Sequence, residues 1–194
     1  MRLSSRLLLS TLLLFVLSTH AISQKRYCPV PPPSPFKHSG RIVTSFDRAA
    51  GGMRTTLEHP RSLGKGAEEI YLVASFVHRD PRRAATPTIE LALVSSSPIT
   101  RYRDAHSLVF FCDGQQQAFN QKVSYKAQPG AGGVTLEATR INLSYADAVS
   151  LTRSRKVSAR LGVTEVAFTN NHLEALRELV SLMAPSSGRW GAEE

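Results

Sequence analysis

From residue 41 onward the chain is a series of short apolar runs separated by turn-forming residues, and this spacing restricts its fold most. Short runs rich in Val, Ile, Phe and Thr are typical of strands, whereas helices need longer stretches with a repeat near 3.6 residues. Glycine-containing steps between the runs favour tight hairpins. The pattern therefore predicts a mainly β (α+β) domain, an antiparallel β-sandwich of about eight or nine strands.

Two of the runs indicate strands in the middle of a sheet. Residues 69–78 (EIYLVASFVH) are apolar at both odd and even positions, which predicts a central strand covered from both sides. Residues 88–94 alternate between apolar and polar side chains, which predicts a strand with one buried face. The other expected strands are residues 41–46, 53–58, 107–112, 117–126, 134–143, 156–161 and 164–168.

The expected strand at residues 134–143 has a change of phase. Its apolar side chains occupy two sets of alternate positions, first Val134, Leu136 and Ala138 and then Ile141 and Leu143. Because successive side chains of a strand point to opposite faces, the change predicts an irregularity near Thr139.

Two segments have the marks of helices. Ser144 followed by Asp147 has the form of a capping box, so a short helix is expected from there to about Arg153. Residues 169–171 (TNN) supply helix-capping side chains for a second helix, which ends before Pro185. Its apolar residues recur at helical spacing, so we expect this amphipathic helix to pack on the sheet with Leu173, Leu176, Leu179, Val180 and Met183.

The first 23 residues have the composition of a secretory signal peptide. Arg2 and Arg6 precede an apolar run at residues 7–17, which is shorter than the roughly 20 residues of a membrane-spanning helix. The small residues Ala21 and Ser23 favour cleavage after Ser23. We therefore expect a secreted or periplasmic protein without a membrane span after cleavage. An uncleaved membrane anchor is the alternative.

The composition also predicts how the rest of the chain is divided. Residues 24–40 include a proline run (PVPPPSP), which is typical of an extended spacer. Residues 41–185 are long enough for one β-rich domain, and residues 186–194 are expected to form a loose tail.

The mature chain is basic. Residues 1–23 hold two of the 24 Lys and Arg residues and none of the 15 Asp and Glu residues, so the remaining net charge is 22 − 15 = +7. A charge of this size favours contact with anionic surfaces, although solvated loops are the plainer interpretation of any single cation. The densest basic groups, and thus the candidate contacts, are Arg79, Arg82, Arg83, Arg153, Arg155 and Lys156.

Two cysteines, Cys28 and Cys112, remain after cleavage. In an oxidising compartment they are expected to form one disulfide, which stabilises by about 4 kcal/mol in the chain-entropy model. The alternative is that Cys112 is a buried free thiol and Cys28 is free or pairs between chains.

No motif for a catalytic, metal or cofactor site is evident. The sequence has no Gly-x-Ser-x-Gly nucleophile elbow, its histidines are widely separated, and its glycine-rich stretch at residues 130–133 leads into a strand. An acid/base pair of carboxylates from distant strands would suit a secreted hydrolase, and this is the alternative function. The candidate carboxylates are Glu90, Asp104, Asp113 and Glu137.

The second half of the chain resembles a group of uncharacterised exported bacterial proteins. The resemblance rests on LVFFCDG at 108–114, LSYADAVSLTRSRKVSARLG at 143–162, TEVAFTNNHLEAL at 164–176 and RELVSLM at 177–183. It implies a β-rich body with a C-terminal helix–hairpin–helix and an extracytoplasmic location, and it implies no activity. The group carries a small aliphatic residue in place of Cys112, so the resemblance lends the disulfide no support.

These observations predict an exported bacterial envelope protein that acts as a non-enzymatic binding or interaction module with a basic surface. The expected partner is an envelope protein or an anionic envelope polymer, with no specific binding of nucleic acid. A purely structural or assembly subunit is a third class, for which we would expect a large exposed apolar patch.

Overall fold

A computed structural model describes residues 35–64, 69–78, 88–105, 107–117, 119 and 122–183. All of them belong to one compact unit, Ser34–Glu194. The expected signal peptide, most of the proline-rich spacer and the expected tail lie outside the described residues, and so do Arg79, Arg82 and Arg83.

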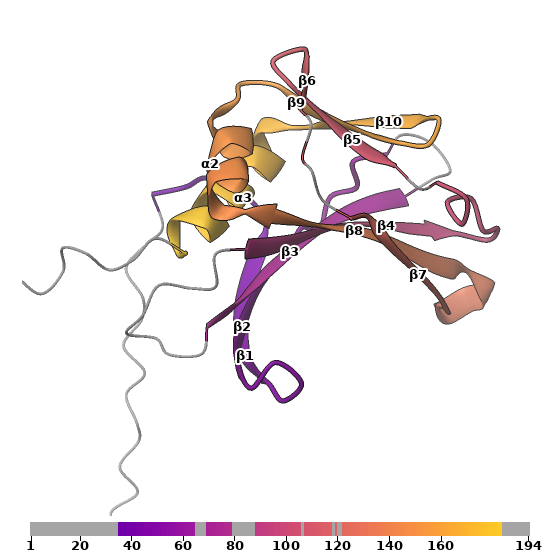
Figure 1. Cartoon of the computed structure of the whole chain (residues 1–194). Coiled ribbons are helices and arrows are strands. Elements are labelled where there is room, and N and C mark those ends of the chain that lie inside the picture. Colours follow the sequence, from indigo (N-terminus) through magenta and orange to yellow (C-terminus); the bar gives the residue numbers. More distant parts are fainter. Residues whose placement is uncertain are drawn as a thin grey trace, which may run out of the picture. The chain divides into compact units, whose positions relative to one another are not determined.

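Two antiparallel sheets make up most of this unit (Figure 1), which confirms the predicted mainly β class. The larger sheet has the strand order β1-β2-β3-β4-β8-β7, and the smaller sheet has the order β10-β9-β5-β6. The strands are β1 Arg41–Asp47, β2 Gly52–Glu58, β3 Glu69–His78, β4 Thr88–Ser97, β5 Leu108–Cys112, β6 Gln115–Gln117, β7 Ser124–Pro129, β8 Thr135–Ser144, β9 Val157–Leu161 and β10 Thr164–Phe168.

Strand β3 lies between β2 and β4, as predicted for a central strand. One of its faces is fully buried and includes Ile70, Leu72 and Phe76. Its other face was expected to be covered as well, but Tyr71 and Val73 there are only half-buried. The second face of β3 is therefore covered less completely than the first.

One hydrophobic core joins both sheets and both helices, α2 Tyr145–Arg153 and α3 Asn170–Ser181. Helix α3 contacts β2, β3, β10 and α2, so the C-terminal helix packs on the sheet as predicted. Full burial of a large aliphatic side chain contributes about 1.5–3 kcal/mol. The predicted apolar face of α3 is buried at Leu173, Leu176, Leu179 and Val180, and it continues to Met183.

Ser144 caps the first helix at the predicted position, with Asp147 at the third helical position. The Ser144 hydroxyl accepts the backbone N–H of Asp147 at 3.1 Å and donates to the Asp147 carboxylate at 2.7 Å. These bonds satisfy a backbone donor that has no partner within the helix, which explains why α2 begins here. Neither α2 nor α3 is long and apolar enough to cross a membrane.

The prediction of a single strand at residues 117–126 is wrong. The Asp113-Gly114 turn returns the chain along β5 as β6, in the smaller sheet, whereas β7 pairs with β8 in the larger sheet. The chain therefore changes sheets between residues 117 and 124, and the described part has ten strands. A local apolar pattern carries no information about which sheet a strand joins.

The prediction of an irregularity near Thr139 is also wrong. Strand β8 pairs with β4 in continuous register from Ser144, opposite Thr88, to Thr135, opposite Ser97. Its inward face therefore carries Glu137 and Thr139 in phase with Ile141 and Leu143, and Leu136 and Ala138 face the other way. The regular pairing prevails because hydrogen bonds compensate the buried Glu137 carboxylate, as described below.

Candidate functional site

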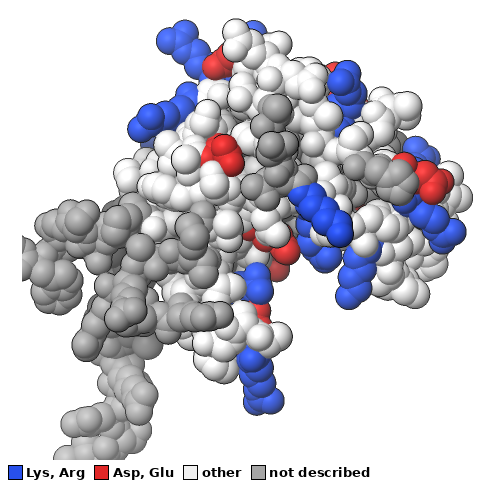
Figure 2. Space-filling model, in the orientation of Figure 1, with Lys and Arg blue, Asp and Glu red and all other residues white. Residues whose placement is uncertain are grey.

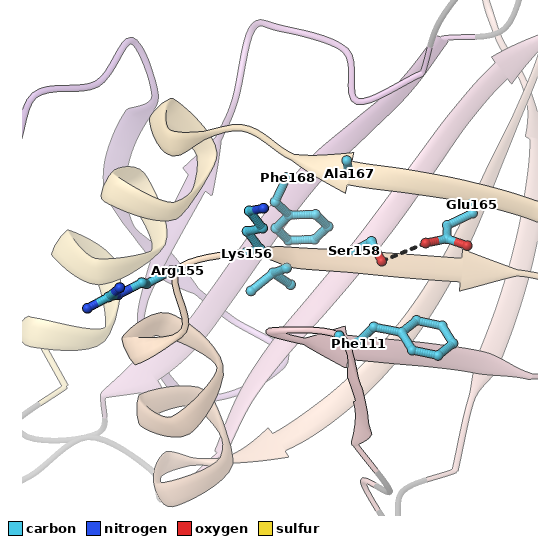
Figure 3. A pocket seen from close by; sticks show the side chains of 9 residues that line it. Phe111, Arg155, Lys156, Ser158, Glu165, Ala167 and Phe168 are labelled. Carbon is cyan, nitrogen blue, oxygen red and sulfur yellow. Dashed lines mark hydrogen bonds between the residues drawn. The ribbon is translucent and has the colours of Figure 1, made fainter.

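The outer face of the smaller sheet carries a pocket of about 470 Å³ (Figure 3). A volume of this size lies within the range of ligand-binding pockets, roughly 300–1,000 Å³. Strands β5, β9 and β10, the turn after β5 and the segment between α2 and β9 all contribute to it. Its lining residues are Phe111, Gly114, Arg155, Lys156, Val157, Ser158, Glu165, Ala167 and Phe168.

The alternation of the strands explains which side chains face the pocket. Phe111, Ser158 and Ala167 are directly cross-strand from one another in β5, β9 and β10. Their chain neighbours, such as Phe110 and Ala159, point to the opposite face and are buried in the core. Because Phe110 and Phe111 are adjacent, one aromatic ring must lie on the outer face.

Arg155 and Lys156 are held at the pocket by a neighbouring turn. Asp113 lies in the left-handed region with a φ of 51°, and its carboxylate accepts the backbone N–H of Arg155 at 3.0 Å and of Lys156 at 2.9 Å. In return, the Asp113 N–H donates to the Lys156 carbonyl at 2.8 Å. The turn after β5 thus fixes the backbone of both cations, while their side chains remain exposed.

Two further charged side chains, Arg160 and Glu165, lie on this face. The Arg160 guanidinium lies over the Phe111 ring, 4.9 Å from its centroid, in a cation–π contact worth about 0.5–1 kcal/mol at an exposed site. The Ser158 hydroxyl donates to the Glu165 carboxylate at 2.8 Å (Figure 3). The pocket and its rim therefore combine aromatic surface with the cations Arg155, Lys156 and Arg160 and the carboxylates Glu165 and Asp113.

Two of the six cations predicted to contact an anionic surface line this pocket. Arg153 lies nearby in the sequence, exposed in the last turn of α2, but it is not part of the lining. Figure 2 shows Lys and Arg side chains at separate places on the face in view, several with Asp or Glu close by. The Lys and Arg side chains on that face form no single continuous basic patch. The pocket is therefore a stronger candidate site than a basic surface patch.

The four candidate carboxylates of a hydrolase have separate surroundings. Glu137 is 1% exposed and accepts the backbone N–H groups of Arg101 at 2.8 Å and Tyr102 at 2.9 Å. It also accepts the Tyr125 hydroxyl at 2.7 Å, and burial together with this bond raises the pKa of Tyr125. Glu137 therefore has a structural role, joining the β4–β5 loop and β7 to β8.

The other three carboxylates also lie in different surroundings. Glu90 lies on the opposite face of the larger sheet from Glu137 and is 3.7 Å from the Arg140 guanidinium. Asp113 is engaged with backbone N–H groups, and Asp104 is exposed in the β4–β5 loop. Glu90 and Glu137 point away from each other, so they do not form an acid/base pair across a shared substrate.

Cys112 ends β5 on the core side and is 6% exposed. Burial raises the pKa of its thiol, which keeps it protonated and unreactive. Cys28 lies outside the described residues, so the disulfide between the two remains a prediction.

Within the part of the chain that the structure describes, no group of three or more His, Cys, Asp or Glu side chains is arranged to hold a metal ion. Comparison with protein-family models, with curated proteins and with solved structures found no match. The candidate site therefore rests on its own geometry. The charge pattern of the sequence predicted Arg155 and Lys156, but Ser158 and Glu165 carried no signal beyond strand alternation.

Proposed function

We propose that this chain is an exported envelope protein that acts as a non-enzymatic binding module, and that the pocket of the smaller sheet binds an anionic group of its partner. The observation that carries the proposal is the placement of Arg155 and Lys156 at a pocket lined by Phe111 and Phe168. The Asp113 turn holds the backbone of both cations before any ligand arrives, which lowers the ordering cost of binding.

The chemistry of the pocket favours an anionic envelope polymer as the ligand. The cations Arg155, Lys156 and Arg160 lie at or beside the pocket. The two carboxylates there are already engaged in hydrogen bonds, Glu165 with Ser158 and Asp113 with backbone N–H groups. Exposed cations attract phosphate or carboxylate groups at long range, and the half-buried Phe111 ring offers apolar surface to the adjoining sugar or glycerol units. Such binding is expected to weaken as salt is added.

The test is calorimetric titration of the mature chain with a poly(glycerol phosphate) teichoic acid at about 50 mM and about 500 mM NaCl. We expect Arg155→Ser combined with Lys156→Ser to weaken binding at least about tenfold at low salt. The control is Lys122→Ser combined with Lys126→Ser, which removes the same charge from exposed positions before and within β7. Equal losses in both double variants, or binding that salt leaves unchanged, would overturn the proposal.

A further inference from the structure

Residues 35–40, here called the strap, lie along helix α3. The Ser39 backbone N–H and hydroxyl both donate to the Asn171 side-chain oxygen, at 3.1 and 2.9 Å. The His38 imidazole Nε2 donates to the Glu178 carboxylate. A Cβ added to Gly40 would lie 3.0 Å from the Ala175 Cβ, so the strap backbone packs directly on the helix.

These contacts fall at helix positions 171, 175 and 178, which share one face of α3. The strap therefore contacts one stripe of α3, and at Gly40 it also lies against the Leu57 side chain of β2. It is also the point at which the sequence preceding residue 35 joins the folded domain.

A pair of buried histidines lies next to the contact between Ser39 and Asn171. His59, directly after β2, is 3% exposed and His172, in the first turn of α3, is 1% exposed. Their ring centroids are 3.9 Å apart at an interplanar angle of 36°. The His59 Nε2 donates at 2.6 Å to the same Asn171 oxygen that accepts from Ser39, so the pair and the strap share one acceptor.

The partners of His172 require a neutral imidazole. Its Nδ1 accepts the Thr169 backbone N–H at 3.3 Å and the Thr169 hydroxyl at 2.6 Å. Its Nε2 donates to the Arg61 carbonyl at 3.0 Å. A proton on Nδ1 would face the Thr169 N–H and remove an acceptor from the capping box that begins α3.

The surroundings of His172 also disfavour a positive charge. Burial lowers the pKa of His172 most strongly, and charge on His59 and Arg61 lowers it further, against the opposing effect of the bond to the Arg61 carbonyl. The first turn of a helix is the positive end of its dipole, which disfavours a cation there as well.

The two carboxylates of α3, Glu174 and Glu178, have partners of their own. His38 engages Glu178, a bond that a neutral or a protonated imidazole can donate. Glu174 pairs with Arg177 at 2.6 Å, and Arg177 also donates to the Thr152 and Ser154 carbonyls at the end of α2.

We propose that the strap is a pH-sensitive latch: it is closed on α3 at neutral pH, and it opens when the buried His172 beside His59 takes up a proton from mildly acidic solution. The proton adds to Nδ1 of His172 and breaks its bonds to Thr169. The first turn of α3 then loosens together with Asn171, and Ser39 loses its acceptor. The latch is independent of the pocket of the smaller sheet.

The test is hydrogen exchange of the Ser39 amide in the mature chain at about pH 7.5 and about pH 5.5, corrected for intrinsic exchange and compared with the Leu72 amide in β3. We expect protection of Ser39 to fall about tenfold for each pH unit below the onset of protonation, while Leu72 stays protected.

Two variants separate the latch from general acid destabilisation. His172→Gln keeps an acceptor at the third helical position but does not titrate, so it should make Ser39 protection independent of pH. His78→Gln is the matched control, because burial lowers the pKa of His78 too, and this residue lies at the end of β3 opposite Met53. The control should open like the natural chain.

A second measurement covers the case in which His172→Gln fails to fold. In the natural chain, the NMR titration of the His172 ring protons should have the same midpoint as the opening of Ser39. Different midpoints, or Ser39 protection equal at both pH values, would overturn the latch.

Discussion

Glu137 accepts the backbone N–H of Tyr102 at 2.9 Å in the interior of the domain, although 35 residues separate the two in the sequence. The same carboxylate accepts from Arg101 and from the Tyr125 hydroxyl, so three donors converge on it. Burial of a charge is costly unless hydrogen bonds replace its hydration, and here they do. The loop between β4 and β5 is thereby tied to β8.

We predict that Glu137→Gln lowers the free energy of unfolding by about 2–4 kcal/mol, because the amide leaves at least one buried N–H without a charged acceptor. Urea titration of the mature chain measures it. The control is Glu90→Gln in the neighbouring strand; the Glu90 side chain is 41% exposed, and we expect a change within about 0.5 kcal/mol. Similar losses in both variants would contradict a structural role specific to Glu137.

The end of α3 offers a matched pair of leucines. Leu179 is 0% exposed and Leu182 is 49% exposed. We expect Leu179→Ala to cost about 2–5 kcal/mol, because it leaves a cavity between the helix and the sheet. Leu182→Ala should cost less than about 1 kcal/mol. Thermal and urea unfolding of the two variants would refute the packing of α3 if the order were reversed.

Stability should fall in mild acid. The pKa values of His172 and His78 are lowered from 6.5 by burial, so between the folded values and 6.5 the unfolded chain binds more protons than the folded one. The stabilisation is therefore complete above about pH 6.5 and is lost as the pH falls below it. Unfolding free energies measured from about pH 8 to pH 5 test the sign. A flat or rising profile towards acid would be inconsistent with the lowered pKa values of these two imidazoles.

The disulfide between Cys28 and Cys112 is a further prediction. Mass analysis of the exported chain should show no alkylation without reductant and two alkyl groups after reduction in denaturant. Cys112 is buried, so alkylation of the native reduced chain should be slow at this residue. Two alkylated cysteines in denaturant without prior reduction would exclude the bridge.

The features that the sequence predicted well are local. The Gly162-Val163 turn between β9 and β10 is present, and Gly162 has the left-handed φ of 60° that such a turn requires. The Ser144 cap is equally local, since Asp147 lies three residues away, and the apolar face of α3 is visible in the spacing of its own residues. Signals of this kind depend on backbone geometry that a short segment determines by itself.

The features that the sequence did not reveal depend on distant partners. The phase of β8 is decided by its pairing with β4 and by donors at Arg101 and Tyr102, so apolar alternation around Leu136 favoured the wrong face. The candidate pocket was predicted only through its cations. His59 and His172 are more than a hundred residues apart in the sequence, and only the packing of α3 beside the end of β2 brings them together.

The pairing of β5 with β9 has a consequence for how this chain reaches its native state. Leu108 lies opposite Leu161, and β7, β8 and α2 lie between them in the sequence. Closing so long a loop costs entropy before any pairing energy is gained, whereas β1 to β4 can form from consecutive hairpins. We therefore expect strands β1 to β4 to nucleate folding, and the long-range pairings of β8 with β4 and of β9 with β5, which forms the pocket, to follow.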